Sequence, residues 1–108
     1  MDAARDTGRA FEQALTVPDY DAACGLLAPA TREQLEQDEE RACPEALAAV
    51  RLPVARTLHA TEVYGRQAMM RADDETLFLS QFSRGWRVVA AGCRPREGKP
   101  YQCVVKGG

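Results

Sequence analysis

The chain has little of what catalytic and metal sites are usually built from. Its 108 residues include one histidine and one tryptophan. No two cysteines stand two to four residues apart, the spacing that is typical of structural zinc sites, and we therefore expect no metal. No apolar run reaches the roughly 18 residues that a membrane-spanning helix needs. The sequence thus contains no catalytic or metal-binding motif and predicts no cofactor.

The chain also lacks a strong excess of charge of either sign, because its formal net charge is −2 and its sequence pI is about 5.4. Nucleic-acid binding needs a basic surface, which this balance does not predict. The same balance gives no electrostatic attraction to anionic membranes, so we expect no membrane contact by this segment itself. Hydrophobic and charged fractions of 45% and 28% are those of an ordinary globular protein, and the length predicts one domain over residues 1–108.

Four cysteines are the most informative residues present. Cys24 and Cys43 flank one predicted helical segment, and Cys93 and Cys103 flank one polar turn. An even count in local pairs predicts the disulfides Cys24–Cys43 and Cys93–Cys103, each worth about 3 kcal/mol in the chain-entropy account. The alternative is four free, buried thiols in a cytosolic protein. Disulfides indicate an oxidising compartment, and so an extracytoplasmic location, either secreted or anchored at the outer face of the membrane.

The N-terminus does not fit that location by itself. The first residues, Met1-Asp2-Ala3-Ala4-Arg5-Asp6, lack the apolar stretch of a signal peptide. We therefore expect that a signal peptide or an upstream membrane anchor has been removed and that Met1 is not the start of the native precursor.

Residues of about 3–52 form a helical half. Apolar spacing predicts a helix over 3–16 that Pro18 ends, and a second helix that Asp19 or Asp21 caps. Thr31 to Gln34 matches a capping box that would open a third helix, ending near Glu40. Cys43-Pro44 fits an N-cap followed by proline at the first helical position, opening a fourth helix that stops at Leu52-Pro53.

Residues of about 55–106 form a sheet half. Leu77 and Leu79 would face one way and Phe78 and Phe82 the other, and Trp86, Val88 and Ala90 would share one face. Short connections favour antiparallel neighbours, and helices followed by strands predict an α+β fold with the helices on one face of a curved sheet. The predicted strands are 56–64, 67–72, 76–82, 86–93 and 101–106, with a polar loop over 94–100.

Two sets of residues are candidates for a site. Tyr64, Met70, Phe78 and Trp86 could line a pocket on the concave side of the sheet, although plain core packing is the commoner role of such residues. His59 is expected to be a surface or half-buried strand residue rather than a general base. Asp73, Asp74 and Glu75 are expected to form a solvated turn rather than a cation site or an acid–base pair.

The segment "TLFLSQFSRGWRVVAAGCRPREGKPYQC", with "DAACGLLAPATREQLE" and "CPEAL" before it, is similar to extracytoplasmic proteins of actinobacteria in the nuclear transport factor 2-like (SnoaL-like) superfamily. The resemblance covers most of the chain and includes both cysteine pairs. It implies a cone-like, cystatin-like fold in which N-terminal helices and a bent antiparallel sheet enclose a cavity. Some members are isomerases or cyclases that use Asp, Tyr or His, but no matching set is present, so no catalytic residue is carried over.

These observations predict a non-enzymatic, disulfide-stabilised extracytoplasmic domain, such as the outer part of a lipoprotein. It would bind a protein partner or a small apolar ligand, or form a homodimer through its sheet face. The alternative is a small isomerase- or cyclase-like enzyme or a ligand carrier with its site in the cone, for which Tyr64, His59 and Asp73 are the groups to test. A filled interior with an exposed apolar sheet face favours the first prediction, and a cavity with convergent polar groups favours the second.

Overall fold

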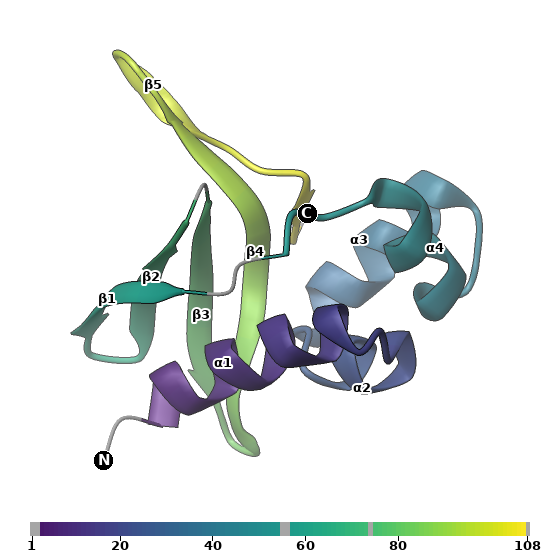
Figure 1. Ribbon diagram of the computed structural model, residues 1–108, viewed down its shortest axis with the longest axis horizontal. Helices are drawn as coiled ribbons and strands as arrows, with labels where there is room; N and C mark the ends of the chain where they lie inside the picture. The colour runs from purple at the N-terminus through teal and green to yellow at the C-terminus, as the bar shows by residue number, and fades with distance from the viewer. Residues whose placement is uncertain (1–2, 55–56, 74, 108) are drawn as a thin grey trace.

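Four helices precede a six-stranded antiparallel sheet in the computed structural model (Figure 1), which describes residues 3–54, 57–73 and 75–107. The strands are ordered β1-β2-β3-β4-β5, and β6 also pairs with β4. This confirms the predicted α+β class. The elements are α1 (Ala3–Thr16), α2 (Tyr20–Gly25), α3 (Pro29–Glu39), α4 (Cys43–Val50), β1 (Leu58–Tyr64), β2 (Gln67–Ala72), β3 (Thr76–Phe82), β4 (Gly85–Arg96), β5 (Lys99–Gln102) and β6 (Val105–Lys106).

Helix α1 crosses one face of the sheet, in front of β3 and β4 in Figure 1. It buries Ala4, Phe11 and Leu15, which recur at helical spacing. Gly8 lets the helix approach closely, because a Cβ atom there would lie 2.7 Å from the sulfur of Met70 in β2. None of the described helices is both long and apolar enough to cross a membrane.

The space between the helices and the sheet is filled with large apolar side chains. The fully buried set faces inward from α1, α4 and three strands, and includes Leu77 and Leu79 as predicted. Burying such side chains supplies most of the favourable free energy of a fold this size. The largest members are Phe11, Leu47, Met70, Leu77, Leu79 and Val88.

The connection between α2 and α3 lies alongside β4. The amide of Val88 donates to the carbonyl of Leu26, and the amide of Ala28 donates to the carbonyl of Val88, each at 2.8 Å. This short parallel contact fixes the start of α3 against the edge of β4. Of the two predicted caps of α2, Asp19 is the one observed, since its carboxylate accepts a hydrogen bond from the Ala22 amide at 3.1 Å.

The predicted cap of α3 is wrong. The N-cap is Ala28, three residues earlier than predicted, and the helix begins at Pro29, so Thr31 lies in its first turn. The Thr31 hydroxyl donates instead to the carbonyl of Val89 at 3.0 Å, a partner 58 residues away. Helix α4 is shifted by one position, because its N-cap is Ala42 rather than Cys43.

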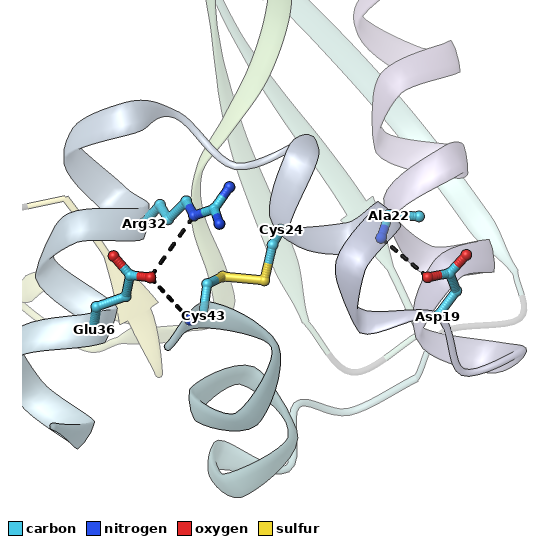
Figure 2. Close-up of a disulfide and its surroundings, with 6 residues drawn as sticks. All are labelled: Asp19, Ala22, Cys24, Arg32, Glu36 and Cys43. Atoms are coloured by element: carbon cyan, nitrogen blue, oxygen red, sulfur yellow. Dashed lines mark hydrogen bonds and ion pairs between the residues drawn. A yellow bond between two sulfur atoms is a disulfide. The ribbon is translucent and has the colours of Figure 1, made fainter. Parts of the chain in front are cut away.

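Both predicted disulfides are present. Cys24–Cys43 ties α2 to the start of α4 (Figure 2), and both cysteines are buried. Beside it, the Glu36 carboxylate of α3 accepts a hydrogen bond from the Cys43 amide at 2.9 Å. Three helices therefore meet at one cross-link. Cys93–Cys103 joins the second half of β4 to the residue after β5, with the two Cα atoms 3.9 Å apart.

Strand β4 changes direction and partners along its length. Leu79 pairs with Val88 and Phe78 with Ala90, so Val89 is an extra residue in β4. This bulge places Ala90 on the opposite face from Val88, which corrects the predicted shared face. Beyond the bulge β4 runs on to Arg96 and pairs with β5, so most of the predicted 94–100 loop is a hairpin. The predicted last strand is accordingly two short strands, β5 and β6.

Gly92 lies at a second bend of β4, where the pairing with β3 shifts again between Phe78–Ala90 and Thr76–Cys93. Its φ is +66°, a backbone conformation that side chains other than hydrogen disfavour. A Cβ atom there would lie 2.8 Å from Leu52 Cδ2 and 3.0 Å from Val104 Cβ. The chain after the helical half and the chain before β6 thus both pack onto this glycine.

Replacing Cys24 and Cys43 by alanine should lower the free energy of unfolding by about 3 kcal/mol, because the unfolded chain regains the freedom that the bridge removes. Urea denaturation of the oxidised protein measures this loss. Adding reductant to the variant should lower the free energy of unfolding by about 3 kcal/mol more, because it breaks Cys93–Cys103. A reductant effect below about 1 kcal/mol on the wild type would contradict the stabilising role of both bridges.

Gly92→Ala should destabilise the protein by about 3 kcal/mol, through backbone strain together with the clash against Leu52 and Val104. Gly98→Ala is the matched control, because Gly98 has a φ of +68° but no heavy atom within 4 Å of its added Cβ. It should cost about 1 kcal/mol, the backbone part alone. Equal losses in chemical denaturation would show that the packing at Gly92 is unimportant.

Candidate functional site

The sheet face that points away from α1 includes a group of large side chains, Tyr64, Met69, Phe78 and Tyr101. We call this surface the outer face. Met69 is opposite Phe78 in the β2–β3 pair, and Tyr64 is opposite Gln67, two residues from Met69. The ring of Tyr101 meets that of Phe78 edge to face, with centroids 5.1 Å apart. Residues from four strands thus form one continuous surface.

One of these four side chains is much more exposed than the other three. Tyr64 is 64% exposed, whereas Met69, Phe78 and Tyr101 are partly buried by one another and by the strands. The surface therefore has a packed centre and an exposed aromatic residue at one side. Aromatic residues and methionine are enriched in protein interfaces.

Charges beside Tyr64 are paired with each other. Glu62 lies 3.6 Å from Arg71 across β1 and β2, and the Tyr64 hydroxyl donates a hydrogen bond to the Glu62 carboxylate. That bond and the Glu62 charge raise the pKa of the Tyr64 hydroxyl. This polar group positions the Tyr64 ring at the edge of the outer face without adding net charge to it.

The four residues of the predicted pocket are divided between the two faces of the sheet. Tyr64 and Phe78 belong to the outer face. Met70 and Trp86 are buried on the other face, in the core under the helices. The sheet itself therefore separates the two pairs.

The residues of the predicted alternative site are also separated. His59 and Asp73 come together, with Nε2 and Oδ1 3.4 Å apart, at the end of β1 opposite to Tyr64. Both side chains are about half exposed. Exposed ion pairs of this kind contribute little to stability, and this pair lies outside the core.

Glu75 is buried, which corrects the prediction of a solvated turn over 73–75; Asp74 lies outside the described residues. Only 5% of Glu75 is exposed, and its Oε1 accepts a hydrogen bond from the Gly92 amide at 3.2 Å. The side chain of Glu12 in α1, 3% exposed, hydrogen-bonds to it. Two carboxyl groups thus meet inside the protein, next to the bend in β4.

Burial raises the pKa of Glu75 to about 7. The hydrogen bonds from Gly92 and Glu12 and the charge of Arg94 act in the opposite direction but are weaker. Glu75 can therefore gain or lose a proton near neutral pH, which is a property shared by acid–base catalysts and by structural carboxyl pairs. A sequence signal for Glu12 existed, because it follows Ala4 by eight residues and precedes Leu15 by three and so lies on the buried face of α1.

Comparisons with known proteins add nothing to this geometry. No protein-family model, no curated protein and no solved structure matches the chain. The residues and their arrangement therefore carry the functional argument alone.

Stability should fall as pH rises through neutrality, because the folded-state pKa of Glu75 is above its unfolded value of about 4.5. The contribution is complete below pH 4.5 and is lost as the pH passes about 7. Between pH 5 and 8, wild type should lose about 2 to 3 kcal/mol relative to Glu75→Gln, which cannot ionise.

Urea denaturation at both pH values measures this difference. Glu33→Gln, at an exposed position of α3, is the matched control and should run parallel to wild type. A Glu75→Gln profile parallel to wild type would show that Glu75 ionises at an ordinary pKa.

Proposed function

We propose that the protein is a non-enzymatic, disulfide-stabilised extracytoplasmic domain that binds a protein partner through its outer face. The observation that supports this most strongly is the continuous surface of Tyr64, Met69, Phe78 and Tyr101 on the side of the sheet away from α1. Large apolar side chains fill the opposite side. The outer face is therefore available for a partner, whereas the space on the opposite side of the sheet is filled by the core.

A protein partner suits this surface better than a small ligand. Small ligands need concave sites that enclose most of their surface. Four cavities bounded by described residues, of about 200 to 600 Å³, are lined by none of the four side chains. An interface with a half-buried centre and a rim of paired charges, as Glu62 and Arg71 provide, is typical of macromolecular recognition.

The extracytoplasmic part of the proposal rests on the two disulfides. Such cross-links persist in oxidising compartments and are rare in the cytosol. Both are compatible with a secreted protein or one anchored outside the membrane. Helices that precede a bent antiparallel sheet are also what a nuclear transport factor 2-like protein of an actinobacterium would have, and we propose that superfamily on the sequence resemblance.

The buried pair of Glu12 and Glu75 supports a second candidate, a small acid–base enzyme or ligand carrier. A carboxyl group with a pKa of about 7 is suited to proton transfer at neutral pH. We rank this function second because both residues are at most 5% exposed, so a substrate would have to open the core to reach them.

Photo-crosslinking tests the binding function. The protein with Tyr64→p-benzoylphenylalanine, irradiated in envelopes of the producing cells, should give one discrete adduct with another protein. The same photoreactive residue at Glu33, exposed on α3, is the control and should give none. With the identified partner in hand, Tyr64→Ala/Met69→Ala should weaken binding about tenfold or more, as the loss of two interface aromatic or apolar anchors predicts.

Two results would contradict the proposal. An adduct between two copies of this chain would replace it with self-association through the sheet. An adduct pattern that is equal at positions 64 and 33 would show that the outer face has no special role.

A further inference from the structure

A groove of about 440 Å³ lies between the β3–β4 hairpin and the start of α3. Three of its nine lining residues are arginines, Arg32, Arg84 and Arg87, and none is acidic. Its other walls include Phe82, Leu27 and Pro29. In a chain with a net charge of −2, this clustering of cations is a local feature and not a consequence of composition.

Three different elements hold the arginines around the groove. Arg32 comes from α3, Arg84 from the turn of the hairpin, and Arg87 from β4. The backbone bonds between Leu26–Ala28 and Val88 fix α3 beside β4 and so bring Arg32 to the same groove as Arg87. The convergence therefore depends on the fold and not on neighbouring positions in the sequence.

Little nearby charge opposes these cations. Arg32 lies 3.9 Å from Glu36, whose same oxygen already accepts from the Cys43 amide (Figure 2). Arg87 donates to the backbone carbonyl of Trp86, which carries no net charge. Within the described part of the chain, no carboxylate forms an ion pair with Arg84 or Arg87. Guanidinium groups stay charged at any physiological pH, so the groove is positive throughout.

We infer that this groove binds an organic phosphate, with the phosphoryl group held by the three arginines and an apolar part against Phe82. Guanidinium groups match phosphate oxygens in geometry and bind them through paired, charge-assisted hydrogen bonds. Phe82 is 41% exposed and offers the ligand an aromatic surface next to the charges. A groove of this volume is within the usual range for small-molecule sites. None of the four side chains of the outer face lines this groove.

Phenyl phosphate is the probe, because it combines one phosphoryl group with one aromatic ring. Titrated into the full chain, it should shift the backbone amide resonances of residues 24–32 and 82–87. Arg84→Gln/Arg87→Gln should weaken its binding at least about tenfold, as expected for the loss of charge-assisted bonds. Arg66→Gln, which removes the same charge from the exposed β1–β2 turn, is the matched control and should bind within about twofold of wild type.

Two further variants keep the result independent of any folding defect in the double variant. Arg84→Gln alone changes only an exposed turn residue and should weaken binding several-fold. Phe82→Ala should weaken phenyl phosphate but leave inorganic phosphate binding unchanged, because only the former uses the ring.

Vesicles distinguish a soluble phosphate from a phospholipid headgroup as the source of the ligand. If the protein binds phosphatidylcholine vesicles that contain phosphatidic acid, and phenyl phosphate releases the protein from them, the phosphate ligand is a lipid headgroup. If only phenyl phosphate binds, the ligand is soluble; both results support the site. The proposal is overturned if phenyl phosphate shifts none of the groove resonances, or if Arg66→Gln weakens binding as much as Arg84→Gln/Arg87→Gln.

Discussion

The bend of β4 at Gly92 is the constraint on which the rest of the structure depends. Strand β4 pairs with β3 on both sides of this glycine, with β6 just before it and with β5 from Arg94 onward. The amide of Gly92 donates to Glu75, and its missing side chain leaves the space that Leu52 and Val104 occupy. One backbone position thus brings together the end of the helical half, the buried carboxyl pair and the segment between β5 and β6.

The two disulfides reinforce this arrangement at different places. Cys93 follows Gly92 directly, so its bridge to Cys103 holds the segment between β5 and β6 at the bend. The bridge between Cys24 and Cys43 lies among the helices, where α2 and α4 each offer only a few buried residues. Helices this short are marginal on their own, and a cross-link with tertiary packing is a direct way to keep them in place.

Local chemistry in the sequence was enough to predict much of the fold. The four helices, the first three strands, the α+β class and both cysteine pairs follow from spacing along the sequence, and all are present. The errors arise where a distant partner decides. Thr31 resembles a cap, yet its hydroxyl is bound by the carbonyl of Val89, and the bulge at Val89 moves Ala90 to the other face. No local pattern encodes such one-residue shifts, because they depend on how two strands pair.

The candidate sites were harder to predict for a related reason. A buried carboxylate is costly unless it is neutral or hydrogen-bonded, so a run of acids such as 73–75 is normally read as solvated. What overrides that expectation at Glu75 is Glu12 from α1 and the Gly92 amide from β4, two groups that are far apart in the sequence. The arginines of the groove are likewise spread over 55 positions and converge only because Leu26–Ala28 lies against β4. The buried carboxyl pair and the arginine groove are therefore both products of the contacts between the helical and sheet halves, which no single segment of the sequence encodes.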